Sequence, residues 1–135
     1  MQDNGPNPHV TNIEELTLRN ENYRTTLWTG SQLQLTLMAI QPGEDIGLEV
    51  HDDHDQFLRV EQGTAQVVMG PNATELESWD AKDGSAIFVP AGTWHNIINT
   101  SETSLKLYSI YAPPEHPHGT VHTTKADAEA DEHDH

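Results

Sequence analysis

The stretch "GSAIFVPAGTWHNIIN", residues 84–99, contains a sharp break between two apolar runs. The run "AIFV" precedes the break, and the second run begins at Trp94 and ends at Asn99. The break itself is Pro90-Ala-Gly92, where proline fixes φ and glycine permits a backbone conformation that other residues rarely adopt. This pattern predicts two short β-strands joined by a tight turn, with His95 placed directly after the turn.

Alternation of apolar and polar residues extends the strand prediction to both sides of this stretch. In "SQLQLTLMAI", residues 31–40, leucines alternate with glutamine and threonine, as a half-buried strand requires. "QFLRVEQGTAQVVMG", residues 56–70, predicts two strands about a turn at Gly63, and "SLKLYSIYAP", residues 104–113, predicts a further strand. Short strands separated by Gly, Pro and Asn indicate an all-β fold, which is an antiparallel sandwich or barrel.

The two ends of the chain differ from this central region. Near the N-terminus, Thr11 followed by Glu14 is typical of a capping box, which predicts a short helical turn. From residue 113 onward the apolar content falls, and we expect either a short helix capped by Thr124 and Asp127 or disorder. The predicted organisation is therefore an N-terminal arm at 1–24, one barrel domain at 25–112, and an acidic, His-rich tail at 113–135 that is helical or disordered.

The composition restricts the partners and the cofactor chemistry. Six Lys and Arg against 22 Asp and Glu give a formal net charge of -16, which disfavours nucleic acid and anionic membrane surfaces as partners. Cysteine is absent, so a bound metal must be held by nitrogen and oxygen atoms. The sequence has neither a signal-peptide pattern nor a run of about eighteen apolar residues, and we expect a cytoplasmic protein.

The stretch "GEDIGLEVHDDHDQFLRVEQG", residues 43–63, supplies the candidate metal ligands. In an extended segment Glu49 and His51 leave the same face, roughly 6.5 Å apart at about 3.3 Å per residue, which suits two ligands of one ion. Gln56 begins the next strand in phase with Leu58, and it therefore points inward if that leucine lies in the core. With His95, one carboxylate, one amide oxygen and two imidazoles can converge.

The spacing of these residues resembles two motifs of the cupin superfamily. The first family motif is Gly, five residues, His-x-His, three or four residues, Glu, six residues, Gly. The second is Gly, five residues, Pro-x-Gly, two residues, His, three residues, Asn. The matching positions are Gly43, Glu49, His51, Gln56 and Gly63 in the first motif and Gly84, Pro90, Gly92, His95 and Asn99 in the second.

The resemblance implies a fold and a subgroup. The fold is a double-stranded β-helix, the jelly-roll barrel, and it would cover roughly residues 25–112. The flanking segments 12–30 and 111–125 look like those of small single-domain cupins, which often carry the label mannose-6-phosphate isomerase-like.

Two ligand positions depart from the family pattern. Glu49 stands where the family usually has histidine, and Gln56 stands where it usually has glutamate. Together the two changes keep one carboxylate and two imidazoles, with a neutral fourth donor. The resemblance therefore implies a divalent metal ion, Fe, Mn, Zn or Ni, bound by Glu49, His51, Gln56 and His95, with His54 as an alternative ligand and Glu49 also as a proton carrier.

A metal ion in such a barrel implies a small-molecule metalloenzyme of the isomerase, epimerase, lyase or dioxygenase type, acting on a sugar-like or oxyacid substrate. The alternative is a cupin module that binds a small ligand or metal without catalysis. A catalytic version needs an acid or base besides the ligands, and the candidates are His54, Tyr108 and Tyr111. A phosphosugar is disfavoured because the six basic residues are scattered. We expect a homodimer paired through strand edges.

The tail contains five of the nine histidines. His116-Pro-His118 and His133-Asp-His135 can bind metal loosely, as His-rich tracts do, although a flexible acidic tail accounts for the same composition. A further hypothesis is that His122 folds back onto the mouth of the barrel.

Overall fold

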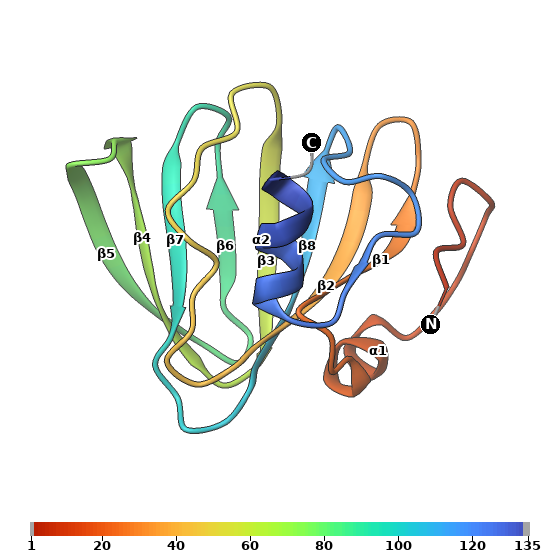
Figure 1. Cartoon of the computed structure of the whole chain (residues 1–135), viewed down its shortest axis with the longest axis horizontal. Helices are drawn as coiled ribbons and strands as arrows, with labels where there is room; N and C mark the ends of the chain where they lie inside the picture. Colours follow the sequence, from red (N-terminus) through yellow and green to blue (C-terminus); the bar gives the residue numbers. More distant parts are fainter. Residues whose placement is uncertain (1, 134–135) are drawn as a thin grey trace.

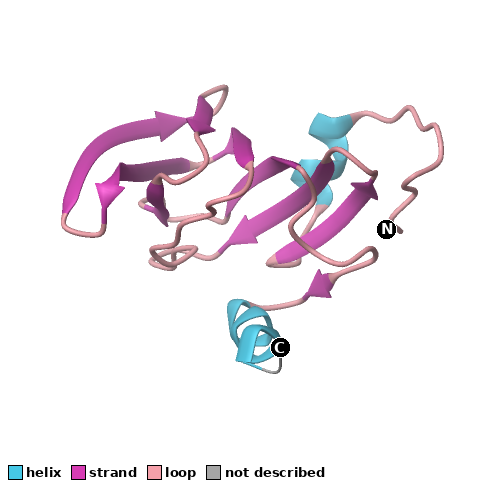
Figure 2. Cartoon of the chain, turned by 90° about the horizontal axis from the view of Figure 1, so that it is seen from above, coloured by secondary structure: helices cyan, strands magenta, loops and turns pink. Residues whose placement is uncertain are grey.

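The computed structural model describes residues 2–133, which form antiparallel strands flanked by two helices (Figure 1, Figure 2). The strands are β1 (Arg24–Thr29), β2 (Gln34–Ile40), β3 (Asp55–Gln62), β4 (Thr64–Asn72), β5 (Glu75–Lys82), β6 (Ala86–Val89), β7 (Trp94–Asn99), β8 (Leu105–Ala112) and β9 (Val121–His122). The helices are α1 (Ile13–Arg19) and α2 (Lys125–His133). No helix in this described part is long and apolar enough to cross a membrane.

The strands form two antiparallel sheets. The larger sheet has the order β6-β3-β8-β2-β1-β9, and the smaller sheet has the order β5-β4-β7. Figure 1 shows the connection between β2 and β3, together with α2, passing in front of the strands. This arrangement confirms the all-β jelly-roll fold that the sequence predicts.

The hydrophobic core lies between the two sheets. Met38, Leu58 and Leu107 come from the larger sheet and are buried in one cluster with Val67 and Ile97 of the smaller sheet. Burial of apolar surface is the dominant stabilising contribution to folding, and it fixes the two sheets against each other.

The inner face of the larger sheet becomes polar toward one end. The register pairs Thr36 with Ser109 and Gln34 with Tyr111, and Gln56 on β3 also lies opposite Tyr111. All five residues are buried. Because buried polar groups require partners, this end of the barrel is suited to polar contents rather than to further hydrophobic packing.

The predicted break at residues 90–92 is a turn. Gly92 has a φ of 81°, and its N–H donates to the carbonyl oxygen of His51 at 2.8 Å. At the far end of the same stretch, the side-chain amide of Asn99 donates to the carbonyl oxygens of Ile40 and Thr103 at 2.8 and 2.9 Å. The turn therefore holds the segment that contains His51 against the start of β7, and Asn99 holds backbone.

At the N-terminus, the predicted capping box is wrong by one residue. Asn12 is the N-cap of α1, and its side chain accepts a hydrogen bond from the N–H of Glu15 at 2.9 Å. Asparagine and threonine are both good N-caps, so adjacent candidates such as Thr11 and Asn12 are difficult to separate by sequence.

The tail adds regular structure to the barrel. β9 pairs with β1, and α2 follows directly. Thr124 and Asp127 form the expected cap, because each backbone N–H donates to the side chain of the other, at 3.3 and 3.1 Å. The hypothesis of a metal-binding pair at His133 and His135 lies outside the residues whose side chains are described.

Candidate metal centre

Glu49 lies in the connection between β2 and β3, but it is held like a strand residue. Its N–H donates to the carbonyl oxygen of His95 at 3.0 Å, and the N–H of His95 donates back to its carbonyl oxygen at 2.9 Å. This isolated antiparallel bridge pairs Glu49 with a residue inside β7. The two sequence motifs therefore meet at this bridge.

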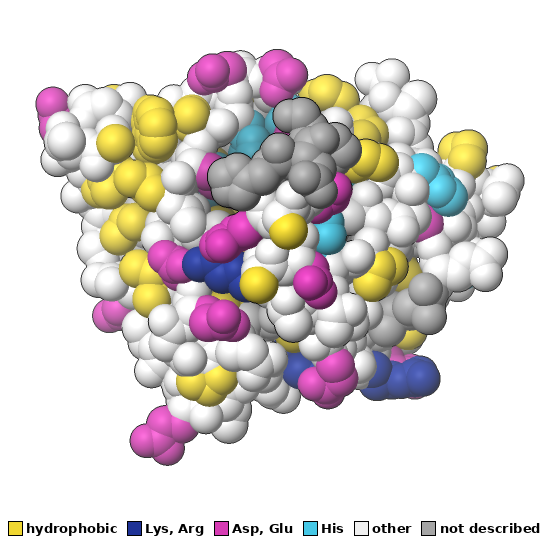
Figure 3. All heavy atoms as spheres, in the orientation of Figure 1, with side chains coloured by type: hydrophobic (Ala, Val, Ile, Leu, Met, Phe, Trp, Pro, Cys, Tyr) yellow, Lys and Arg dark blue, Asp and Glu magenta, His cyan; other side chains and the backbone are white. Residues whose placement is uncertain are grey.

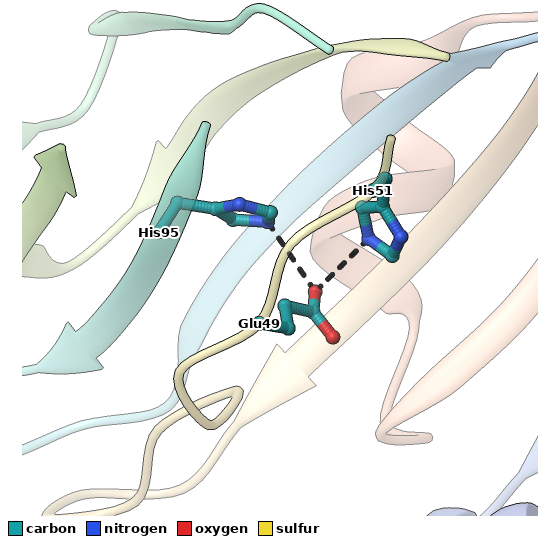
Figure 4. Close-up of side chains that lie close together, drawn as sticks. All are labelled: Glu49, His51 and His95. Atoms are coloured by element: carbon teal, nitrogen blue, oxygen red, sulfur yellow. Dashed lines mark ion pairs between the residues drawn. The ribbon is translucent and has the colours of Figure 1, made fainter. Parts of the chain in front are cut away.

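Three of the four predicted ligands come together in space. The carboxylate Oε1 of Glu49 lies 3.4 Å from Nε2 of His51 and 3.4 Å from Nε2 of His95 (Figure 4). One ligand atom from each of the three residues falls within 4.8 Å of the others. Figure 4 shows both imidazole rings directed toward the carboxylate from different parts of the chain.

The tautomer of His95 is set by its surroundings. Its side chain is fully buried, and Nδ1 lies 3.1 Å from the carbonyl oxygen of Thr93. A carbonyl only accepts, so Nδ1 carries a proton toward Thr93, and Nε2 is the nitrogen that faces Glu49. Fixing one imidazole nitrogen by a hydrogen bond to backbone is the usual way in which a metal-binding histidine is oriented.

Several buried lone-pair donors at this end of the barrel have no hydrogen-bond partner. They include Nε2 of His51, Nε2 of His95 and Oε1 of Gln56. Gln56 uses its amide nitrogen to donate to Oγ of Ser109 at 2.8 Å, which leaves the carbonyl oxygen unused. Two imidazole nitrogens, one amide oxygen and the Glu49 carboxylate are a donor set that fits a divalent cation.

Gln56 is buried as predicted, on β3 of the larger sheet, whereas His95 is on β7 of the smaller sheet. Gln56 lies opposite Tyr111 on β8, and the Tyr111 ring lies 6.0 Å from the ring of His51 in an edge-to-face contact. The structure thus brings Glu49, His51 and His95 into direct contact, and it connects Gln56 to them through Tyr111.

His54 belongs to an adjoining group. Its ring stacks on His51 with centroids 4.5 Å apart, and its Nε2 lies 3.2 Å from the carboxylate of Glu115. Its Nδ1 lies 2.9 Å from Asp53, and its side chain is only 3% exposed. His51, His54 and Glu115 form a second triad of potential ligands that shares His51 with the first.

The charges in the centre reinforce one another. Burial alone would raise the pKa of Glu49, but contact with His51 and His95 lowers it to about 2. Burial alone would lower the pKa of His51, but contact with Glu49 raises it. Glu49 is therefore a carboxylate at neutral pH, which is the form that binds a cation.

Tyr111 and Tyr108, both candidate acids, have different positions. Tyr111 is buried at the polar end of the barrel, and burial raises its pKa to about 12. Tyr108 lies opposite Arg59 and packs against Phe57, and it is on the other face of β8 from Tyr111. Tyr108 is therefore not part of the centre, whereas Tyr111 offers a protonated phenol within it.

His116 lies beside Tyr111, although the sequence suggested it only as part of a loosely metal-binding tract in the tail. Its ring lies 5.3 Å from the Tyr111 ring, and its buried Nε2 has no hydrogen-bond partner. Burial, followed by the nearby Arg24, lowers the pKa of His116 to about 3. The imidazole is therefore neutral and keeps a free lone pair. The only sequence signal was the His116-Pro-His118 tract, which the composition assigned to loose metal binding.

Gln34 holds the segment that carries His116. Its Oε1 accepts from the N–H groups of Glu115 and His116 at 3.2 and 2.9 Å. Its Nε2 donates to the carbonyl oxygen of His116 at 2.7 Å and to Oγ1 of Thr29 at 3.0 Å. Gln34 is fully buried. Its hydrogen bonds to the backbone of Glu115 and His116, called the clamp below, fix the position of the tail segment.

A large hollow on the surface lacks the histidine side chains of this site. This hollow, of about 840 Å³, lies over Trp79, Phe88 and Pro90, outside the barrel, and its lining has no histidine or basic group. Figure 3 shows a face on which acidic side chains are widely spread, with histidine side chains visible at a few separate places. The candidate metal ligands, together with Tyr111 and His116, lie instead at the polar end of the barrel interior.

Comparison with known proteins gives a consistent family. The family model described as "Cupin domain" matches residues 36–111. The chain is 59% identical over 133 residues to the Bacillus subtilis (strain 168) protein named "Uncharacterized protein YrkC", covering 98% of this chain and 72% of that protein.

Solved structures agree with this match. The crystal structure of BH2720 from Bacillus halodurans is similar with a TM-score of 0.95 and 59% identity, covering 96% of this chain and 99% of that chain. The structure of KdgF from Halomonas sp. is similar with a TM-score of 0.61 and 21% identity, covering 68% of this chain and 78% of that chain. At that identity the second similarity concerns the fold alone.

Proposed function

The chain belongs to the cupin domain family, and from this membership we propose that it is a single-domain, metal-dependent enzyme that acts on a small molecule inside the barrel. The reaction type that we propose is that of an isomerase, epimerase, lyase or dioxygenase. The substrate is a sugar-like molecule or an oxyacid that offers oxygen atoms to the metal.

One observation carries this proposal. The Nε2 atoms of His51 and His95 face the same carboxylate oxygen of Glu49 at 3.4 Å, in a site that is largely buried, and neither makes a hydrogen bond. Two imidazole nitrogens and a carboxylate oxygen this close together are a donor set that one divalent cation can bind. Glu49, His51 and His95 would hold the cation, with Gln56 as the fourth donor.

A divalent metal bound at these residues supplies a Lewis acid that polarises a substrate oxygen. The chain supplies the proton chemistry. Tyr111 stays protonated and can donate a hydrogen bond, because its pKa is raised to about 12. His116 stays neutral, and its buried Nε2 has no partner within the protein. These two groups offer hydrogen bonds to a substrate beside the ligands, which supports an enzyme over a non-catalytic cupin module.

The phosphosugar isomerase activity named in the subgroup label is not part of the proposal. Of the six basic residues, Arg24 is the one that the structure places beside Tyr111 and His116, and one cation is a poor match for a phosphate dianion. We also propose a homodimer paired through a sheet edge, supported by Phe88, which is 67% exposed on the edge strand β6. Light scattering of the purified protein tests the dimer. The cytoplasmic location stays a prediction.

Metal content tests the proposed centre. We expect the protein, loaded with Zn²⁺, Mn²⁺, Fe²⁺ or Ni²⁺ and then dialysed, to retain one equivalent of at least one of these ions. His51→Ala and His95→Ala should lose it, and His9→Ala, which changes an exposed histidine far from the centre, should retain it. Equal metal content in all four proteins would contradict the proposal.

Turnover then separates the enzyme from the binding module. The metal-loaded protein is screened against hydroxy acids, keto acids, aldoses and ketoses by NMR and by oxygen uptake. We expect His116→Gln to keep the metal and to lower turnover of the active compound at least tenfold, because it replaces an imidazole that contacts the substrate and not a ligand. Retained metal with no turnover of any compound would favour the non-catalytic module.

A further inference from the structure

We propose that Arg24 is a carboxylate-binding residue inside the barrel, and that the small molecule of the metal centre is a carboxylic acid, bound as its carboxylate at Arg24. This inference names the substrate class of the proposed function and rests on that function for the role of the metal. The binding of carboxylate by Arg24 itself is testable in metal-free protein.

Arg24 is a buried cation without a direct counter-ion. The residue is only 6% exposed. Among residues 2–131, whose side chains are described, no ion pair includes it, and its buried Nε has no hydrogen-bond partner. Its guanidinium also lies 5.3 Å from the centre of the Tyr23 ring, a cation–π contact that does not supply a negative charge. A buried charge without a partner is costly, and an anion bound beside it removes that cost.

The strand register places Arg24 on the inner face. Thr26 pairs with Thr36 of β2, whose other neighbour is Ser109 of β8. Arg24 precedes Thr26 by two residues in the same strand, so both side chains leave the same face of the sheet. That face is the polar end of the barrel, where Oγ1 of Thr36 is also buried without a partner.

Arg24 lies within electrostatic range of the groups beside the proposed centre. After burial, it is the largest influence on the pKa of His116, which it lowers, and on the pKa of Tyr111, where it opposes the rise. Glu49 acts on the same two rings with the opposite sign. His116 and Tyr111 are thus shared by the guanidinium and by the carboxylate of the candidate metal site.

One edge of the guanidinium is held by the tail. A terminal nitrogen of Arg24 donates to Nδ1 of His122 at 3.1 Å, which requires that His122 carries its proton on Nε2. That Nε2 lies 2.9 Å from the carboxylate of Asp131 on α2. The relay orients Arg24 and leaves its Nε donor available. The hypothesis that His122 folds back onto the barrel thereby gains a specific role.

A carboxylate matches these donors better than other anions. The guanidinium presents its N–H groups in a planar fork that fits the two oxygens of a carboxylate. A phosphate dianion would carry twice the charge beside a single cation, with Glu49 and Glu115 near the same rings. A carboxylate held at Arg24 leaves the other oxygens of an oxyacid to face Glu49, His51 and His95.

Carboxylate binding is measured in metal-free protein, prepared with a chelator. The probes are pyruvate, glycolate and malonate, each compared with its neutral amide, and inorganic phosphate and sulfate. Binding is followed by calorimetry and by the ¹⁵N NMR signal of the Arg24 Nε–H group. The variants are Arg24→Gln, Arg24→Lys and the control Arg19→Gln, which changes an exposed arginine on α1.

We expect at least one carboxylate to bind saturably and to shift the Nε–H signal of Arg24, and its amide to bind at least tenfold more weakly. Arg24→Gln should lower the affinity for the carboxylate at least tenfold. The affinity of Arg24→Lys should lie between those of Arg24→Gln and the wild type, and the affinity of Arg19→Gln should equal that of the wild type. Circular dichroism checks folding; if Arg24→Gln is unfolded, the Nε–H signal and Arg24→Lys decide. Carboxylate binding that is absent, or unchanged in a folded Arg24 variant, overturns the inference, as does tighter binding of phosphate.

The same data distinguish this inference from the proposed function. If carboxylate binding depends on Arg24 but the protein retains no metal, the proposed carboxylate subsite is supported and the proposed metal centre is refuted. One retained metal equivalent without carboxylate binding would sustain the centre and remove the subsite.

Discussion

Glu49 and His95 are joined twice, by a reciprocal pair of backbone hydrogen bonds at 3.0 and 2.9 Å and by a side-chain contact of 3.4 Å between Oε1 and Nε2. The backbone bridge fixes a loop residue opposite a residue of β7. Since the side chains of a bridged pair lie on the same side, the carboxylate is carried to the imidazole by backbone geometry alone. The candidate site is therefore preorganised by the fold.

Glu49→Gln tests the contribution of the only carboxylate in the first triad. The substitution keeps the size of the side chain and removes its negative charge. The site that it forms with His51 and His95 then lacks the anionic ligand that attracts a cation. We expect the affinity for Zn²⁺ or Mn²⁺ to fall at least about tenfold. Competition with a metallochromic chelator measures this. Glu102→Gln, at an exposed position, is the matched control, and an affinity equal to that of the wild type would exclude Glu49 as a ligand.

Gln56→Glu tests the departure from the family pattern. The new carboxylate would share the polar end of the barrel with Glu49, and like charges raise each other's pKa. We expect the metal-free protein to lose about 1–3 kcal/mol of unfolding free energy at pH 7, and Zn²⁺ to restore it, because a second anionic ligand strengthens binding. Urea unfolding with and without Zn²⁺ measures both effects.

The control for this substitution is Gln66→Glu, which adds the same charge at a partly exposed position of β4. If Gln56→Glu and Gln66→Glu respond equally to Zn²⁺, Gln56 does not lie at the metal.

The fold and the core of the site followed from local pattern and motif spacing. Alternation located β2, β3, β4 and β8, and the Pro90-Gly92 turn located β6 and β7. The inward phase of Gln56 with Leu58 is a local property, and both residues are buried. β5 was not predicted, because it is largely exposed and lacks an alternating apolar face.

The residues that the sequence did not reveal depend on contacts between distant segments. Arg24 is buried because β9 returns to pair with β1, and the two residues of the Arg24–His122 contact are 98 positions apart. His116 enters the site because Gln34, 82 positions earlier, binds its backbone. Composition assigned Arg24 to the N-terminal arm and His116 and His122 to an acidic tail, because each residue taken singly is polar and the pairing that buries it is not visible locally.

The titration of His116 predicts a specific pH dependence of stability. The unfolded state binds a proton at this residue near pH 6.5, whereas the folded state does so only near pH 3, so the stabilisation is present above pH 6.5 and is lost as the pH falls toward 3. Between pH 7 and pH 5 the metal-free wild type should lose up to about 2 kcal/mol relative to His116→Gln. Urea unfolding in the presence of a chelator, at pH 7, 6 and 5, measures the difference. His9→Gln serves as the control, and an identical pH slope for wild type and His116→Gln would contradict the assignment.

Gln34→Leu tests whether the clamp positions the tail segment. The leucine has a similar volume but leaves the N–H groups of Glu115 and His116 and the carbonyl of His116 without the partners that they have in the native protein. At about 1–3 kcal/mol for each buried group left unpaired, we expect the unfolding free energy to fall by roughly 3 kcal/mol or more. Hydrogen exchange should accelerate at the amides of residues 115 and 116 before it accelerates in β8. Turnover of any substrate should fall while the metal content stays at one equivalent, because the triad of Glu49, His51 and His95 does not depend on the clamp.

Gln66→Leu, which removes a single partly exposed hydrogen bond to Ser78, is the matched control. Unchanged exchange at residues 115 and 116 would show that other contacts hold the segment, and loss of the metal together with the clamp would show that the tail and the centre are one unit.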